Sequence, residues 1–229
     1  MKNIYRGMYD NHKALDLSKN PRIEIMRDIV NDIGAESKNI LDIGCYDGTF
    51  LSLIENKDIT LFGIEASDYA VKEAIKKGIN VKQFFFDDKA EMPFDDNFFD
   101  IIVAGEIIEH IYDTDFFLKE IKRLLKPEGK LIISTPNIAS LGRRLFLLVG
   151  KNPIIEISPN ESDSSGHIRY FTFETLEGLL SKNGFRCLKR QSDIVNFSNN
   201  RLLKSRLLAR IFPHIGQSII AMYQNKKNV

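Results

Sequence analysis

The chain has 229 residues, 43% of them hydrophobic, which is enough for one α/β domain with a full core. A formal net charge of +1 argues against a dedicated nucleic-acid binder, and two cysteines, Cys45 and Cys187, do not make a disulfide framework. The sequence shows no signal peptide and no apolar run of the roughly 18 residues that would suggest a membrane span, so we expect a cytoplasmic protein with reduced thiols.

Short apolar runs alternate with helical patterns through the first 190 residues, which predicts a parallel sheet with helices on both faces. Pro21 opens a helix that Gly34 closes, within an N-terminal helical segment 1–37. The elements predicted next are strand 39–43, helix 49–56, strand 60–64, helix 68–77, strand 81–85 and strand 99–104. A helix capped at Asp113 or Thr114 then buries an apolar stripe as far as Leu125, and strand 130–135 follows.

Two stretches interrupt this alternation. Residues 136–171 carry Gly, Pro and Ser around an apolar patch, and a connection of that length is usually a lid or a binding loop. Helix 173–182 and strand 185–194 come next, then basic and apolar residues over 201–212, then strand 218–223. We expect the last two strands to be antiparallel neighbours, and the inserts 137–171 and 197–216 to form a cap on a single domain, 1–229.

The end of the sequence is basic. From Ile194 to Val229 there is no Asp or Glu, and six Lys and Arg residues give +6, which leaves −5 for the rest of the formal +1. Lys and Arg spaced among apolar residues in 201–212 suit peripheral contact with an anionic lipid surface or a lipid-linked substrate. The alternative is a partly buried helix that covers the sheet edge.

Residues 39–51, reading NILDIGCYDGTFL, predict a strand, a glycine-bearing turn and a helix start, where backbone N–H groups point at a ligand. Asp42 before the turn indicates a ligand with a positive group or hydrogen-bond donors. Polar side chains also follow the next strands, at the carboxyl ends where open α/β sheets bind ligands. The candidate ligand-binding residues of this edge are Asp42, Gly44, Tyr46, Gly48, Glu65, Ala66, Asp87, Asp88, Glu106 and Ile107.

A dinucleotide site is the first alternative, because it also places an acidic residue about 20 positions after a glycine turn. The turn here reads G-x-x-x-G rather than G-x-G-x-x-G, and Asp42 would repel a pyrophosphate. The residues therefore favour a ligand without a pyrophosphate over the NAD that an NAD-dependent oxidoreductase would bind.

The loop resembles the cofactor loop of class I methyltransferases, the S-adenosylmethionine-dependent enzymes, whose pattern is acidic-x-Gly-x-Gly-x-Gly; Tyr46 replaces the middle glycine. The runs DKAEMPFDDNFFDIIVAGEIIEHI and EIKRLLKPEGKLIISTPN are similar to the type-11 and type-23 methyltransferase families. The order of NPR, EIIEH, STPN and SGHIRYFT most resembles the O-methyltransferases of ubiquinone biosynthesis, over roughly residues 15–190. The resemblance implies a Rossmann-like, seven-stranded sheet of order 3-2-1-4-5-7-6 with strand seven antiparallel.

The resemblance implies methyl transfer from S-adenosylmethionine to an oxygen of a small-molecule or lipid-linked acceptor. Glu65 would accept from the ribose hydroxyls, Asp88 or alternatively Asp87 from the adenine amino group, and Arg22 would meet the donor's carboxylate. The alternatives are a module that binds the donor without turnover and, within the methyltransferases, a glycan or sugar modifier. If the Tyr46 ring fills the methionine channel, Tyr46→Gly should tighten donor binding.

Glu106, Glu109 and His110 have i, i+3, i+4 spacing, which on a helical turn gathers three side chains on one face. By the same resemblance this set would hold Mg²⁺ and lower the pKa of a phenol from about 10. Alternatively His110 acts as a general base without a metal, because imidazole can take a hydroxyl proton near neutral pH. The candidate catalytic residues are Glu109, His110 and His167, the last at the end of the long insert.

Overall fold

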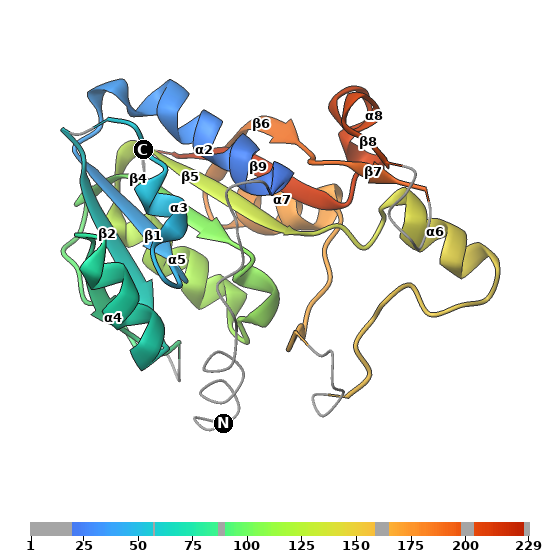
Figure 1. The fold of residues 1–229 in the computed structure, drawn as a ribbon, viewed down its shortest axis with the longest axis horizontal. Helices are drawn as coiled ribbons and strands as arrows, with labels where there is room; N and C mark the ends of the chain where they lie inside the picture. Colours follow the sequence, from blue (N-terminus) through green and yellow to red (C-terminus); the bar gives the residue numbers. More distant parts are fainter. Residues whose placement is uncertain (1–19, 57, 87–89, 159–164, 198–203, 227–229) are drawn as a thin grey trace.

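The computed structural model describes residues 20–56, 58–86, 90–158, 165–197 and 204–226 (Figure 1). Seven strands form one sheet in the order β3-β2-β1-β4-β5-β9-β6. Its strands are β1 (Asn39–Ile43), β2 (Thr60–Glu65), β3 (Asn80–Gln83), β4 (Phe99–Gly105), β5 (Leu125–Pro136), β6 (Phe185–Gln191) and β9 (Ser218–Asn225). β9 runs antiparallel to β5 and β6, and the other pairs are parallel. The predicted order and the antiparallel seventh strand are confirmed.

The helices begin where the sequence offers a capping side chain. The Asn20 side chain accepts a hydrogen bond from the Arg22 N–H at 3.0 Å, and Pro21 occupies the first turn. Asp113 caps another helix through the Phe116 N–H at 2.9 Å. The α-helices are α2 (Pro21–Ile33), α3 (Thr49–Ser52), α4 (Asp68–Lys76), α5 (Thr114–Leu124), α6 (Leu141–Leu148), α7 (Phe173–Lys182) and α8 (Arg206–Ile211), and the short 3₁₀ helices are η2 (Gly34–Glu36), η3 (Ile108–His110) and η4 (Pro213–Ile215).

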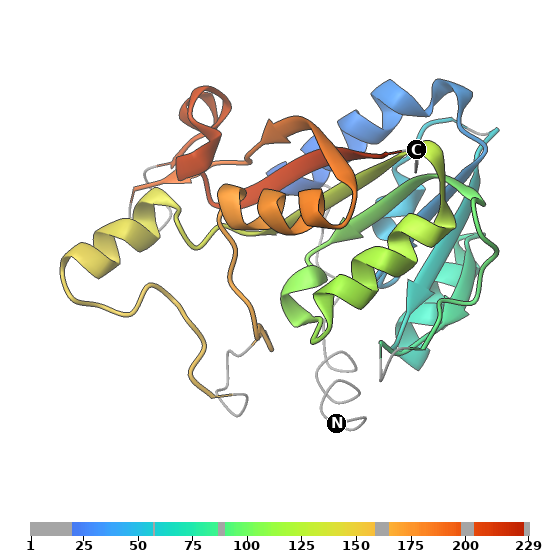
Figure 2. The same ribbon diagram turned by 180° about the vertical axis from the view of Figure 1, so that it is seen from behind.

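Two apolar clusters cover the two faces of the sheet, because successive strand residues point to opposite sides. On one face α2, α3 and α4 pack on alternate strand residues such as Ile40, Ile101 and Ile132. On the other face α5 and α7, which Figure 2 shows in front, pack on the intervening residues, among them Leu41 and Ile102. The α/β architecture with helices on both faces is therefore confirmed.

Several boundaries differ from the predicted ones. β5 starts earlier, because Leu125 pairs with Phe99 before the register shifts and pairing resumes at Lys130. β6 stops at Gln191 rather than at residue 194, because the Asp193 side chain accepts from the N–H groups of Ile194 (2.8 Å) and Ser218 (3.0 Å), so that it joins the turn to β9. The structure also adds α6 and a two-stranded pair, β7 (Val195–Asn196) with β8 (Lys204–Ser205), which were not predicted. α8 lies within 201–212, where a partly buried helix was one of the two expected arrangements, and it buries Ala209.

The long insert leaves the sheet and returns to it at one place. Asn137 and Phe171 form a parallel bridge, and the Ile138 N–H donates to the Phe171 carbonyl at 2.9 Å. The buried Asn137 side chain also donates to the carbonyls of His214 (3.0 Å) and Gly216 (2.8 Å), so it ties both predicted inserts together. Beyond this anchor, α6, α8, β7 and β8 lie together on one side of the sheet (Figures 1 and 2). A single domain over 1–229 stays a prediction, since residues 1–19 of the expected N-terminal segment lie outside the described part.

Candidate active site

The β1–α3 turn has a left-handed backbone at three positions. Gly44 has φ +78° and Gly48 has φ +74°, and Tyr46 between them has φ +46°. The left-handed region is costly for a residue with a side chain, so Tyr46 adopts a conformation that glycine takes readily. Its ring is half-buried, and burial together with the charges of Asp47 and Tyr69 raises the pKa of its hydroxyl.

Glu65, at the end of β2, holds the turn through its carboxylate. Oε1 accepts from the N–H groups of Ala66 (2.7 Å) and Ser67 (2.9 Å), and Oε2 accepts from the N–H of Tyr46 (2.9 Å). Burial raises the pKa of the Glu65 carboxyl, and these three hydrogen bonds act in the opposite direction. A carboxylate oxygen can accept two hydrogen bonds, so Oε2 keeps one acceptor position for a ligand.

Asp42 is a buried carboxyl on β1, with 6% of its surface exposed. Burial and the neighbouring Glu65 raise the pKa of Asp42 to about 7, although Arg22 acts to lower it. A buried carboxylate costs free energy unless a positive partner accompanies it. This place in the site therefore favours a ligand that carries a positive group.

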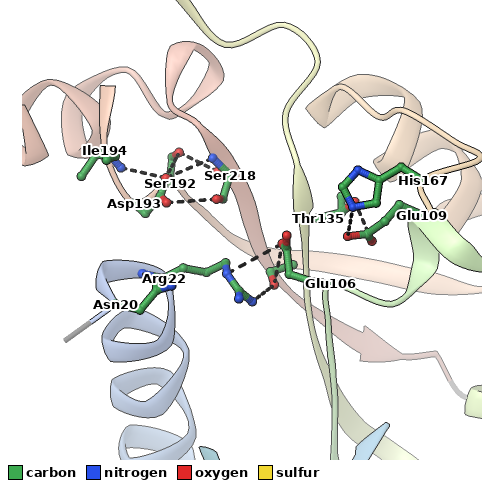
Figure 3. Close-up of polar contacts among 11 residues, drawn as sticks. Asn20, Arg22, Glu106, Glu109, Thr135, His167, Ser192, Asp193, Ile194 and Ser218 are labelled. Carbon is green, nitrogen blue, oxygen red and sulfur yellow. Dashed lines mark hydrogen bonds and ion pairs between the residues drawn. The ribbon is translucent and has the colours of Figure 1, made fainter. Parts of the chain in front are cut away.

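Arg22 of α2 points toward Glu106, which follows β4 (Figure 3). Both side chains also contact Ser134 of β5. Nη1 of Arg22 donates to the Ser134 Oγ at 3.0 Å, and its Nε lies 3.8 Å from the Glu106 Oε1. Glu106 has φ +55°, a left-handed backbone that directs the chain away from a continuous helix after β4. Burial raises the pKa of the Glu106 carboxyl, and the Arg22 charge opposes that rise.

Glu109 lies with Thr135 and His167, apart from Glu106, which is directed toward Arg22 (Figure 3). Its carboxylate is 1% exposed, and Oε2 accepts from the Thr135 hydroxyl at 3.0 Å. Oε1 is buried without a hydrogen-bond partner among the described residues, 3.9 Å from the Nε2 of His167. Burial and the nearby Glu106 raise the pKa of Glu109 to about 8.

The two histidines face each other, with ring centroids 4.9 Å apart. The His110 Nδ1 lies 3.1 Å from the Gly166 carbonyl, which can only accept, so this nitrogen carries the proton. The His167 Nδ1 lies 3.4 Å from the Glu156 Oε1, whose second oxygen accepts from the N–H groups of Gly166 and His167. Burial lowers the pKa of both imidazoles, that of His110 to about 4. Both Nε2 atoms are thereby left to accept.

Seven of the fourteen sequence-predicted site residues form two neighbouring groups near the carboxyl ends of β1, β2, β4 and β5. One group, on the side of α2, has Arg22, Asp42, Glu65 and Glu106. The other has Glu109, His110 and His167, whose ligand atoms all lie within 4.8 Å of one another. Glu106 does not belong to that group, so the expected i, i+3, i+4 set is changed in one member, because the left-handed backbone at Glu106 precedes the η3 turn. Asp87 and Asp88 lie outside the described residues.

The prediction did not include Ser134, Thr135 or Glu156. The first two are in the STPN motif, where alternation along β5 sends Ser134 toward Arg22 and Thr135 toward Glu109. That motif was a usable signal. Glu156 comes from the irregular insert, where no sequence pattern indicated that it would meet His167.

Comparison with known proteins gives consistent matches. The type-23 family profile, described as a methyltransferase domain, matches residues 19–190. Ubiquinone biosynthesis O-methyltransferase of Pelagibacter ubique is 35% identical over 152 residues, covering 59% of this chain and 60% of that protein. The mitochondrial enzyme of that name from Homo sapiens is 29% identical over 154 residues, covering 63% of this chain and 40% of that protein. The match thus spans less than two thirds of either relative.

A solved structure from Thermotoga maritima, described as an S-adenosylmethionine-dependent methyltransferase and possible histamine N-methyltransferase, superposes with a TM-score of 0.64. It is 22% identical, and the match covers 90% of this chain and 89% of that one. At this identity the likeness shows the fold.

Proposed function

Because this chain belongs to the type-23 family of methyltransferase domains, we propose that it transfers a methyl group from S-adenosylmethionine to an oxygen of a small-molecule or lipid-linked acceptor. One observation carries the proposal. Three acidic side chains lie at or next to the carboxyl ends of three adjacent strands, beside a left-handed glycine turn: Asp42 is the penultimate residue of β1, Glu65 ends β2 and Glu106 follows β4. The family assignment leaves the NAD-dependent alternative without support.

The donor-side residues fit a zwitterionic nucleoside ligand. The Glu65 Oε2 has an acceptor position left for ribose hydroxyls, and the Asp42 carboxyl suits an ammonium or sulfonium charge. The Arg22 guanidinium suits a carboxylate, since its planar fork pairs with two oxygens. Gly44 suits the turn because its φ of +78° is strained for a residue with a side chain. Bound S-adenosylmethionine supplies an electrophilic methyl group, and these residues hold and orient it.

The acceptor hydroxyl loses its proton beside Glu109, His110 and His167. Both imidazoles present an unprotonated Nε2, because Gly166 and Glu156 engage the opposite nitrogens. A base held in one tautomer removes a hydroxyl proton at low orientational cost. His167 belongs to the insert, so the return of the insert at Asn137 and Phe171 positions this base.

Alternatively, the same three residues fit a divalent cation, which would occupy the imidazole nitrogens in place of the proton. The resemblance led us to expect that site at Glu106, Glu109 and His110. The fit rests on the orphaned Oε1 of Glu109 and on two imidazoles whose Nδ1 atoms are already engaged. Two nitrogens and one oxygen suit Mn²⁺, Fe²⁺ or Zn²⁺ better than Mg²⁺, which prefers oxygen ligands. When bound, such an ion lowers the pKa of an acceptor hydroxyl.

Titration of the purified protein with Mn²⁺, Zn²⁺ and Mg²⁺ by calorimetry tests the cation site. We expect His167→Ala and Glu109→Gln to lose binding and Glu106→Gln to keep it. A wild-type protein that binds none of the three ions would contradict the site, as would equal losses in all three variants.

A lipid-linked acceptor is supported by the exposed apolar side chains of the cap. α6 buries none of its residues, and α8 buries Ala209 while its larger Leu207 and Ile211 are 66% and 56% exposed. No Asp or Glu occurs in residues 138–155 or 194–226. Apolar side chains beside Lys and Arg are what peripheral contact with anionic lipid requires, although Arg206 of α8 pairs with Glu24 at 3.0 Å. The contact expected over 201–212 thus gains α6 as a second element, while residues 201–203 lie outside the described part. No helix among the described residues is long and apolar enough to cross a membrane.

The proposal is tested by binding and by turnover. Calorimetry should detect binding of S-adenosylhomocysteine and no binding of NAD. Glu65→Gln should weaken the binding of S-adenosylhomocysteine, whereas Glu73→Gln on α4 should leave it unchanged. Release of S-adenosylhomocysteine from S-adenosylmethionine is then measured with catechol, a prenylated catechol and neutral sugars as acceptors. Binding without turnover would favour the regulatory module, and turnover with sugars alone would favour the glycan modifier. A protein that binds NAD and does not bind S-adenosylhomocysteine would contradict the proposal.

A further inference from the structure

Arg143, on the first turn of α6, has a guanidinium nitrogen without a partner. Its Nη1 is buried and makes no hydrogen bond among the described residues. The other two arginines near it are engaged: Arg22 donates to Ser134 at 3.0 Å, and the Arg144 Nε donates to the Ala139 carbonyl at 2.5 Å. A buried charged donor without a partner costs free energy, so its place calls for an explanation.

The neighbours of Arg143 belong to the candidate active site. The negative charge of Glu106 and the Tyr170 hydroxyl act on its guanidinium, and the Arg143 charge in turn acts on His167. None of these residues makes a described hydrogen bond to Arg143, since Glu106 lies with Arg22 and Ser134 while the Tyr170 hydroxyl accepts from the Glu156 N–H at 2.6 Å. Arg143 therefore stands within electrostatic reach of both the donor side and the acceptor side, with a donor unused.

We propose that Arg143 binds an anionic oxygen group, a carboxylate or a phosphate, of the methyl acceptor and thereby selects acidic acceptors. This inference rests on the proposed function, because it assigns the acceptor class of the same site. Arginine retains its charge when buried, and its planar fork donates two parallel hydrogen bonds to such a group. The acceptor would place its anion on the cap and its hydroxyl at His167, so one ligand would join the insert to the sheet.

The segment that carries Arg143 strengthens the assignment. Residues 138–155 hold Arg143, Arg144 and Lys151 and no acidic residue, so α6 brings a net positive charge to the site. The start of α6 lies close to β7, since a Cβ at Gly142 would be 3.3 Å from the Asn196 carbonyl.

The test compares two neighbouring arginines in the full chain. Wild type, Arg143→Ala, Arg143→Lys and Arg144→Ala are titrated with sodium benzoate and with inorganic phosphate by calorimetry, with and without S-adenosylhomocysteine. A charged hydrogen bond removed from a buried site should weaken anion binding about 10-fold to 100-fold in Arg143→Ala. Arg143→Lys should fall between, and Arg144→Ala should change less than about twofold. Binding of benzoate assigns a carboxylate, and binding of phosphate assigns a phosphate.

A second measurement uses turnover. The ratio of kcat/KM for 3,4-dihydroxybenzoate over that for catechol should fall by the same factor in Arg143→Ala, and should change less than about twofold in Arg144→Ala. The inference is overturned if wild type binds neither anion, or if Arg143→Ala and Arg144→Ala weaken binding alike. Failure of the proposed function would appear separately, as absence of S-adenosylhomocysteine binding, because the anion titrations also run without it.

Discussion

Asp42→Asn should stabilise the protein and weaken its donor site at the same time. The folded-state pKa of about 7 lies above the ordinary aspartate value of 3.8, because burial and the neighbouring Glu65 disfavour ionisation of this carboxyl. Stability is therefore lost as pH rises from about 4 to 7, and the loss is constant above pH 7. At about 1.4 kcal/mol for each pKa unit, the cost is about 4 kcal/mol at pH 8 and about 1.6 kcal/mol at pH 5. An uncharged amide avoids this cost.

The assay is urea denaturation at pH 5 and pH 8, followed by circular dichroism. The free energy of unfolding of Asp42→Asn, relative to wild type, should rise by about 3 kcal/mol between the two pH values. Binding of S-adenosylhomocysteine at pH 8 should weaken, because an amide lacks the charge that attracts the ligand's ammonium group. A carboxylate that destabilises the folded protein in the same ionised form that binds the ligand is typical of a ligand site.

Asp100→Asn is the matched control of opposite sign. Asp100 accepts from Lys126 Nζ at 2.7 Å and from the N–H groups of Lys38 and Asn39 at 3.0 Å each. Burial tends to raise its pKa, but these partners outweigh burial and lower it. Its contribution to stability is thus present above the unfolded-state pKa and is lost in acid, so Asp100→Asn should destabilise the protein at pH 8. Equal stability of Asp42→Asn and wild type at both pH values, or lower stability at pH 8, would refute the reasoning.

Three further outcomes are expected. Gly48→Ala should lower the free energy of unfolding by about 2 kcal/mol more than Gly78→Ala does. Both glycines have positive φ, but only Gly48 lacks room for a Cβ, so equal losses in the two variants would contradict the close contact of Gly48 with its neighbours. Tyr46→Gly should be more stable than Tyr46→Ala by about 1 kcal/mol, and identical stability would mean that the turn is not left-handed at this residue. In vesicle co-sedimentation, Leu148→Asp should reduce binding to phosphatidylglycerol while Ile75→Asp on α4 should not, and a wild type that stays in the supernatant would exclude the contact.

The sheet and its donor edge were predictable because their signals are local. Short apolar runs alternating with helical patterns predicted the strands. Carboxylates near the carboxyl ends of parallel strands lie at the same edge of the sheet, independent of the paths that the loops take. Pro21 and Asp113 marked the starts of their helices, and the structure adds Asn20 as the cap before Pro21. The predicted end of β6 failed at a tertiary contact: Asp193 meets Ser218, 25 residues away, and no local pattern shows that.

The acceptor side was only partly predictable. Glu109 and His110 come from a motif, but their grouping with His167 depends on the path of an insert with no periodicity. Helical spacing placed Glu106 with them, and one left-handed residue separated it. Arg143 was not singled out, because an arginine in an apolar run reads as an exposed side chain until a fold buries it. Tertiary contacts, rather than propensity, decide such positions.

β9 has a consequence for how the molecule is made. The last strand of the described chain fills an interior place in the sheet, between β5 and β6. While the chain is being synthesised, β1, β2, β3, β4 and β5 can pair with one another in the order β3-β2-β1-β4-β5. Until β9 is made, however, β5 keeps an open edge and β6 has no neighbouring strand. Such edges pair readily with other chains, so the nascent protein is vulnerable until β9 emerges. A nascent chain stalled before residue 218 should therefore depend on chaperones, and one extended past residue 225 should not.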